Sequence, residues 1–270
     1  GLLILYNVAG NLDPFLGLGA FAVLMAVFPW LAQRSLRFKL YNTSYRGLRF
    51  GFDGTTGGSY KAFLLWPLVG YITMGFLMPL AHHRIKLYQH GNSRYGTEKF
   101  GFRASESGFF GIYFKLLGML ILMGIAIAAL VGTKAWLESQ DGGSDKEMMA
   151  GMIAFAMLGF YFMAFLLLGP WFNARIQNLV WNGTALGPHS FASNVRARDL
   201  FVIYLTNLIG IILTLGLFKP FADIRLAKYR LERMALNAQG SLEEFVAGQQ
   251  QGATATGEEA AEIFDFDISF

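Results

Sequence analysis

The chain has 270 residues, of which 54% are hydrophobic and only 15% charged, and it contains no cysteine. Soluble domains carry about 25% charged residues, so this composition predicts a membrane protein, while the lack of cysteine excludes disulfides and thiolate metal sites. The net charge is +4, yet all 22 basic residues lie at or before Arg233 with only 11 of the 18 acidic ones. We expect this basic body to contact anionic lipid headgroups. We expect no nucleic-acid partner, because the basic residues flank apolar segments.

Five apolar segments are long enough to cross a hydrocarbon core of about 30 Å. They are residues 14–32, 61–81, 110–133, 148–172 and 199–221. A further apolar stretch, residues 1–8, has no initiator methionine and lacks the features of a signal peptide. We expect that this sequence lacks residues that precede Gly1.

A proline followed five residues later by an arginine closes four of the long apolar runs. The pairs are Pro29/Arg34, Pro79/Arg84, Pro170/Arg175 and Pro220/Arg225. Residues 73–88 also match residues 214–229 at six positions with a constant offset of 141. Such self-similarity predicts a duplicated structural unit. We therefore divide the chain into a first repeat half (1–109), a second repeat half (110–237) and a linker with an acidic tail (238–270).

An asparagine, a glycine and a phenylalanine follow the arginine in three copies of the unit. They are Asn42, Gly47 and Phe50; Asn92, Gly96 and Phe100; and Asn182, Gly187 and Phe191. An Asn/Gly turn followed by alternating aromatic residues, as in Phe50-Gly51-Phe52, predicts a short β-hairpin. The fold expected from the sequence is thus an all-α polytopic membrane protein with an internal tandem duplication and small β-hairpins on its cytoplasmic surface. Each proline is expected to begin a helix.

The charges predict which ends of the apolar segments face the cytoplasm. Basic segments follow all four Pro–Arg pairs, whereas Asp13 and the 134–147 connection are acidic, so the basic segments are placed inside. Residues 61–81 and 199–221, however, have basic flanks at both ends. We predict that both are re-entrant, with breaks at Pro67/Gly70 and Asn207/Gly210. The alternative is that both cross fully, which would give the two halves opposite orientations, as in inverted-repeat transporters.

The pattern Thr73, Gly75, Pro79, Ala81, Arg84 and Tyr88, with the later Gly96 and Phe100-Gly101-Phe102, resembles the YjgN-like family of bacterial inner-membrane proteins. The resemblance extends over essentially the whole chain and is closest over residues 73–102. The last copy departs from the pattern, because Arg233–Met234 occupies the expected Asn-Thr position. The resemblance implies a multi-pass protein of the bacterial inner membrane. It brings no established activity, catalytic residue or cofactor.

Three sets of residues are candidates for functional contacts. The arginines of the four Pro–Arg pairs either extend to lipid phosphate as structural snorkelling residues or form a lipid-headgroup or anion site. They are Arg34, Arg84, Arg175 and Arg225. Thr206 and Asn207 lie within an apolar segment, where they either line a transport pathway or make helix–helix hydrogen bonds. His82 and His83 point to different sides of a helix, so we expect no metal site there.

The third set lies in the C-terminal tail. Phe264, Phe266, Ile268 and Phe270 alternate with Asp265, Asp267 and Ser269, which is the periodicity of a β-strand. We expect this strand to dock on an exposed sheet edge by β-augmentation, with the Phe-Gly-Phe segments as the nearest candidate edges.

Catalytic and cofactor-binding motifs are missing from the sequence, so we predict no enzyme activity, no cofactor and no metal. We predict a non-enzymatic scaffold or partner subunit of a membrane complex, which acts with a protein partner or as a homo-oligomer. A channel or transporter built on the internal repeat, with re-entrant segments 61–81 and 199–221, is the alternative.

Overall fold

The computed structural model describes residues 13–140, 146–240 and Val246. The chain divides into two compact units, of which unit 1 comprises residues 1–106, 183–191 and 236–270 and unit 2 comprises residues 107–182 and 192–235. The predicted docking strand, from Phe264 to Phe270, lies outside the described residues.

Unit 1 contains one long apolar helix and a helical hairpin. Helix α2 (Pro14–Tyr41) begins at Asp13, whose carboxylate accepts from the backbone N–H of Phe15 at 2.6 Å. Residues 56–72 are helical throughout, as α3 (Thr56–Tyr60), the π-helical turn η1 (Lys61–Leu65) and α4 (Trp66–Ile72). After a turn at residues 73–77, α5 (Met78–Gly91) returns and packs against α4.

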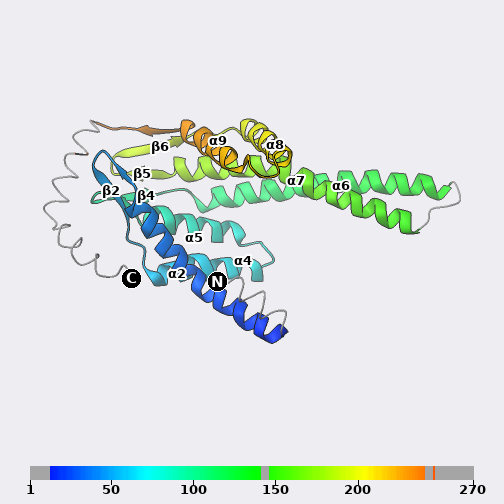
Figure 1. The fold of residues 1–270 in the computed structure, drawn as a ribbon, viewed down its shortest axis with the longest axis horizontal. Coiled ribbons are helices and arrows are strands. Elements are labelled where there is room, and N and C mark those ends of the chain that lie inside the picture. The colour runs from blue at the N-terminus through cyan, green and yellow to red at the C-terminus, as the bar shows by residue number, and fades with distance from the viewer. Residues whose placement is uncertain (1–12, 141–145, 241–245, 247–270) are drawn as a thin grey trace. The chain divides into compact units, whose positions relative to one another are not determined.

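Unit 2 is formed mainly by four helices. Figure 1 shows α6 (Glu106–Gln140) and α7 (Lys146–Asn182) as the longest helices of the described chain. Helices α8 (Ala197–Leu213) and α9 (Lys219–Glu232) form a second helical hairpin with a turn at residues 214–218. The buried centre of this unit is formed by Ala174 of α7, by Leu200 of α8 and by Val195, which precedes α8. Leu226 and Tyr229 of α9 pack against it.

In the part of the chain that the structure describes, seven strands form one sheet in which the spatial order equals the order along the chain. The strands are β1 (Ser44–Tyr45), β2 (Leu48–Phe52), β3 (Ser93–Tyr95), β4 (Glu98–Phe102), β5 (Thr184–Leu186), β6 (His189–Ser193) and β7 (Met234–Asn237). The pairs from β1–β2 to β5–β6 are antiparallel. Arg46 (φ 48°) and Gly47 (φ 82°) make the two-residue turn between β1 and β2.

The prediction of an all-α fold is wrong. The Asn/Gly/Phe segments do form hairpins, but these hairpins join into one sheet because β2 pairs with β3 (Phe50 opposite Tyr95) and β4 pairs with β5 (Phe100 opposite Leu186). Isolated hairpins would leave rows of unpaired backbone N–H and C=O groups at their edges, and lateral pairing satisfies these groups.

The sheet also has a continuous aromatic face within unit 1. The ring centroids of Phe50 and Phe100 are 6.3 Å apart, those of Phe100 and Phe191 are 6.0 Å apart, and both pairs are stacked. These rings pack on buried Leu48, Tyr95 and Leu186. The alternating phenylalanines that predict strands therefore also form the core of the sheet.

Within the described residues, three helices, not five, are long and apolar enough to cross a membrane: Phe15–Tyr41, Glu106–Lys134 and Ala150–Asn182. Segments 61–81 and 199–221 are each interrupted by a turn.

The four prolines differ as well. Pro79 and Pro220 begin α5 and α9 as expected, whereas Pro29 and Pro170 lie inside α2 and α7, where the prediction of a helix start is wrong. The threonine and glycine that precede Pro79 and Pro220 in the turns are missing before Pro29 and Pro170.

Candidate functional site: two helical hairpins and their arginines

The turn between α4 and α5 satisfies its own polar groups. The Thr73 hydroxyl donates to the Val69 carbonyl at 2.9 Å and accepts from the Leu77 backbone N–H at 3.1 Å. The Gly75 N–H donates to the Gly70 carbonyl at 2.8 Å. Met74 (φ 51°) and Gly75 (φ 90°) adopt the left-handed conformation that reverses the chain.

The turn between α8 and α9 has the same geometry 141 residues later. The Thr214 hydroxyl donates to the Gly210 carbonyl at 2.7 Å and accepts from the Phe218 N–H at 2.9 Å. Leu215 (φ 50°) and Gly216 (φ 97°) reverse the chain, and the Gly216 N–H donates to the Ile211 carbonyl at 2.8 Å.

Large apolar side chains cover the tips of both hairpins. Met74 is 97% exposed and Leu215 is 96% exposed, and Ile72, Phe76 and Leu217 are also exposed. A turn with satisfied backbone groups and an apolar exterior suits a surrounding of lipid, where water cannot complete missing hydrogen bonds.

The predicted positions of the breaks are wrong. Pro67 lies at the start of α4 in continuous helix, and Gly70, Asn207 and Gly210 lie within helices. The two glycines instead provide room for the returning helix: a Cβ on Gly70 would lie 2.9 Å from the Met78 sulfur, and one on Gly210 would lie 2.7 Å from the Phe218 ring. The chain reverses where threonine and glycine close a turn.

Arg225 and the predicted pathway residues form one polar cluster in unit 2. Arg225 Nη1 donates to Thr206 Oγ1 at 2.7 Å and to Asn207 Oδ1 at 3.3 Å. Asn207, which is 7% exposed, donates through Nδ2 to the Ala222 carbonyl at 3.2 Å. These contacts join α8 to α9, so the amide of Asn207 makes a helix–helix hydrogen bond.

A second cluster, which the sequence did not indicate, closes the base of the same hairpin. The Tyr229 hydroxyl donates to Asp199 Oδ2 at 2.9 Å, and Arg233 Nη2 lies 3.3 Å from the same oxygen. Burial raises the pKa of Tyr229 above its usual value. The signal available in the sequence was Asp199 itself, an acidic residue at the edge of an apolar segment.

Arg84 in unit 1 has a different environment from Arg225. Its Nη2 lies 2.9 Å from Glu106 Oε1, and its guanidinium lies 5.3 Å from the centroid of the Trp66 ring. The neighbouring His83 is buried, and its Nε2 lies 3.0 Å from the Ala104 carbonyl oxygen. Arg84 is therefore paired with a carboxylate.

The other two arginines are exposed on long helices. Arg34 of α2 lies 5.8 Å from the centroid of the Trp30 ring, and Arg175 lies on α7. Among the described residues, groups of three or more metal-binding side chains are not found, His82 and His83 included.

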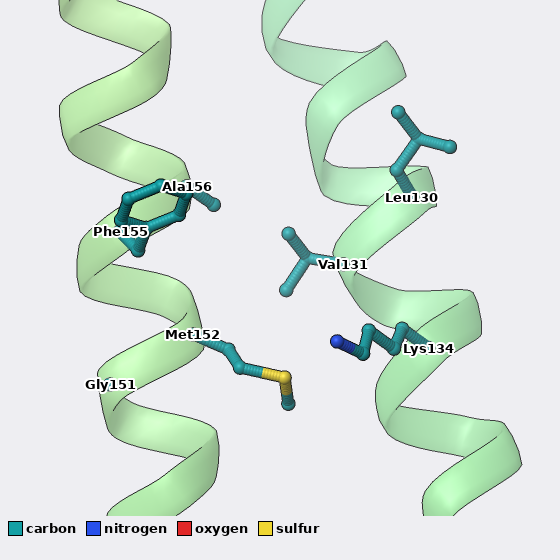
Figure 2. A pocket seen from close by; sticks show the side chains of 7 residues that line it. All are labelled: Leu130, Val131, Lys134, Gly151, Met152, Phe155 and Ala156. Carbon is teal, nitrogen blue, oxygen red and sulfur yellow. The ribbon is translucent and has the colours of Figure 1, made fainter.

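An open groove lies between α6 and α7, as Figure 2 shows. Its lining is Leu130, Val131, Lys134, Gly151, Met152, Phe155 and Ala156. Lys134 is the only charged residue in this lining and lies at the end of an apolar span. An apolar groove with one polar group suits lipid chains better than a polar substrate.

Three helices of membrane-crossing length, two apolar-tipped hairpins and a joined sheet are features of a membrane protein with few polar groups in its apolar part. The chain belongs to the bacterial family of proteins of unknown function DUF898, whose profile matches residues 1–263. This is the family that the Thr73–Phe102 pattern indicated. Searches among curated proteins and among solved structures give no match.

Proposed function

We propose that this chain is a multi-pass protein of the bacterial inner membrane with a duplicated helical-hairpin unit. The identical turn geometry at Thr73–Leu77 and Thr214–Phe218 supports the duplication, because both turns use the same hydrogen bonds and the same left-handed residues. In this proposal α2, α6 and α7 cross the membrane, and both hairpins enter and leave it on one side.

Strand pairing supports the re-entrant arrangement. Residues 53–92 connect β2 to β3, whose residues Phe50 and Tyr95 are paired, so both ends of this segment lie at the sheet. A single crossing by residues 61–81 would separate the paired strands by the membrane. Two crossings would need about 20 residues each, whereas α5 and α9 have 14 residues and rise about 21 Å. Each hairpin is long enough to reach the middle of the bilayer and too short to cross it.

The sheet and the basic residues support a cytoplasmic platform. Arg49, Arg94, Lys99 and Arg103 lie on or beside the strands of unit 1, and positive charge favours the cytoplasmic side. We propose that this platform binds a protein partner or a second copy of the chain, and that the protein acts as a scaffold or partner subunit without enzyme activity.

The contacts of Asn207 carry the preference for a scaffold. Its amide donates to a backbone carbonyl of the neighbouring helix and accepts from Arg225, so its hydrogen-bonding groups serve to close a hairpin. A channel or transporter stays the second candidate, and the two proposed re-entrant hairpins are the observation that favours it.

The lack of cysteine makes a direct test of topology possible. Single cysteines replace Tyr45 on the sheet, Met74 and Leu215 at the tips, and Asp141 in the acidic connection. In oriented membrane vesicles a membrane-impermeant maleimide should label Y45C only from the cytoplasmic side and D141C only from the other side. M74C and L215C should react only after detergent is added. Labelling of M74C from the side opposite Y45C would contradict the re-entrant proposal.

A paired experiment separates the two functional classes. The tagged full chain is cross-linked in native membranes and its partners are quantified, with Arg103→Glu as the platform variant and Arg103→Lys as the control of conserved charge. A scaffold predicts a stoichiometric partner that R103E loses and R103K retains. The same protein in liposomes should release no entrapped ions. Ion release that Asn207→Leu abolishes, without a stoichiometric partner, would favour transport.

A further inference from the structure

The two arginines that follow the helix-starting prolines differ in how their charge is balanced. Arg84 lies 2.9 Å from the Glu106 carboxylate, whereas the partners of Arg225 are the neutral oxygens of Thr206 and Asn207. Within the described part of the chain, Arg225 makes no ion pair. Its positive charge is therefore available to an anion from outside the protein.

The contacts of Arg225 also leave a binding edge available. Both hydrogen bonds use Nη1. Among the described residues, no protein acceptor binds the donors on Nε or Nη2. An arginine binds a phosphate through two parallel N–H donors of its planar group. Because Asn207 is buried and held by the Ala222 carbonyl, the guanidinium is held in place before a ligand arrives.

An apolar face lies beside this arginine on α9. Phe221, Ile224 and Leu231 are 65%, 66% and 67% exposed. At 100° per residue these residues and Lys228 fall within a sector of about 80°, and Arg225 lies about 40° beyond Phe221. The ion pair between Lys219 and Asp223, at 3.0 Å, lies roughly on the opposite side of the helix. The face is thus apolar toward the tip and basic at Arg225 and Lys228, whose ammonium lies 3.9 Å from the exposed Glu232 carboxylate.

The corresponding face of α5 is covered by protein. The positions 141 residues earlier are Leu80, His83, Leu87 and His90, and all four are buried or half-buried. His83 contacts the Ala104 carbonyl, and His90 lies 3.3 Å from the Thr184 hydroxyl. On α9, isoleucine and leucine replace these histidines. This exchange suits a face that contacts hydrocarbon rather than backbone.

We infer that the α8–α9 hairpin binds one phospholipid with an anionic headgroup. The lipid phosphate is held by Arg225 and Lys228, and an acyl chain lies along Ile224, Phe221 and the apolar tip. From Lys219, where α9 begins, to Arg225 the helix rises about 9 Å. The apolar turn of residues 214–218 lies beyond it, within the roughly 15 Å between the headgroups and the middle of the hydrocarbon core. This inference rests on the proposed insertion of the hairpin.

The test measures lipid binding to the delipidated full chain in a neutral detergent. Phosphatidylglycerol is titrated and bound lipid is counted by native mass spectrometry, with phosphatidylcholine as the neutral comparison. Arg225→Gln removes the charge, and Arg84→Gln is the matched control. We expect R225Q to weaken phosphatidylglycerol binding about tenfold, the effect of one lost charge-assisted contact, and R84Q to leave it unchanged. Equal weakening in both variants, or in neither, overturns the inference.

Further arms exclude simpler explanations. If R225Q does not fold, Lys228→Gln and Ile224→Ser are measured instead, and both should weaken binding. Inorganic phosphate at millimolar concentration should not displace the lipid, and displacement would show a free-anion site instead. If L215C does not react before detergent is added and R225Q binds phosphatidylglycerol normally, this inference is overturned while the proposed insertion stands. Reactive L215C in the absence of detergent contradicts the insertion itself.

Discussion

Replacing Asn207 with leucine tests whether this amide closes the α8–α9 hairpin. Leucine has a similar volume, so the cavity term is small, but the Ala222 carbonyl loses the donor that lies 3.2 Å away. The Ala222 carbonyl lies within α9 and keeps its helical hydrogen bond. The loss is therefore one net hydrogen bond, worth about 0.5–1.5 kcal/mol in soluble proteins and about 0.6 kcal/mol on average, with a maximum near 1.7, between helices in membranes. The contact between Arg225 Nη1 and Asn207 Oδ1 is long, at 3.3 Å, and only partly buried, so it adds little.

We therefore expect Asn207→Leu to destabilise the protein by about 1 kcal/mol, which corresponds to a fall in Tm of about 2–4 °C. Tryptophan fluorescence of the full chain in detergent micelles follows the thermal transition, since the chain has five tryptophans. Thr133→Val is the control, because Thr133 is exposed and its hydroxyl donates within its own helix to the Leu130 carbonyl. An unchanged Tm for N207L, or an equal fall for N207L and T133V, would refute the assignment of Asn207 to hairpin closure.

Three further predictions concern the turns, the sheet and pH. Gly216→Ala should lower the free energy of unfolding by about 1 kcal/mol, because alanine is strained at φ 97°. Gly19→Ala, at a helical position with free space for a methyl group, is the control and should not lower it. Equal Tm values for the two variants would contradict the role of the turn. Phe100→Ala should cost about 3 kcal/mol by removing the ring between Phe50 and Phe191, with protease resistance of the sheet as the readout; unchanged resistance would show that the aromatic stack is dispensable. Burial, and then the charge of Lys86, lowers the pKa of His90 to about 4 from 6.5. Because the unfolded chain binds this proton more readily, the stabilising effect is complete above pH 6.5 and is lost as pH falls toward 4. The Tm should follow this window in the unsubstituted protein and less steeply in His90→Gln, and parallel curves would exclude His90 as the cause.

The sequence predicted the individual local elements better than the way in which these elements join in the fold. The Asn/Gly/Phe segments indicated hairpins because turn chemistry is local, as at Gly47. The joining of those hairpins depends on pairs such as Phe100 with Leu186, which are far apart in the chain. Pattern alone could not show that Pro29 lies within a helix while Pro79 begins one, since the difference lies in Thr73 and Gly75 of the preceding turn.

In the candidate site, too, single residues could be identified from the sequence but their contacts with one another could not. Arg225 and Asn207 were identified separately, as a headgroup contact and as a pathway residue. Their common cluster became visible only when the turn at Thr214 brought α9 back along α8. The partner of Arg84, Glu106, belongs to the start of the next helix, so a motif confined to residues 73–88 could not reveal that the two arginines differ.

The sequential order of the strands has a consequence for biosynthesis. The outer edge of β4 can pair only after residues 103–183, which include both long helices α6 and α7, have been translated. At about 5–20 residues per second this takes about 4–16 s, during which, in the proposed topology, an aromatic strand edge faces the cytosol. The ribosome-bound intermediate is therefore most vulnerable to misassembly at this stage. Slow or failed insertion of α6 and α7 would prolong the exposure, so completion of the sheet reports that the membrane part has been inserted correctly.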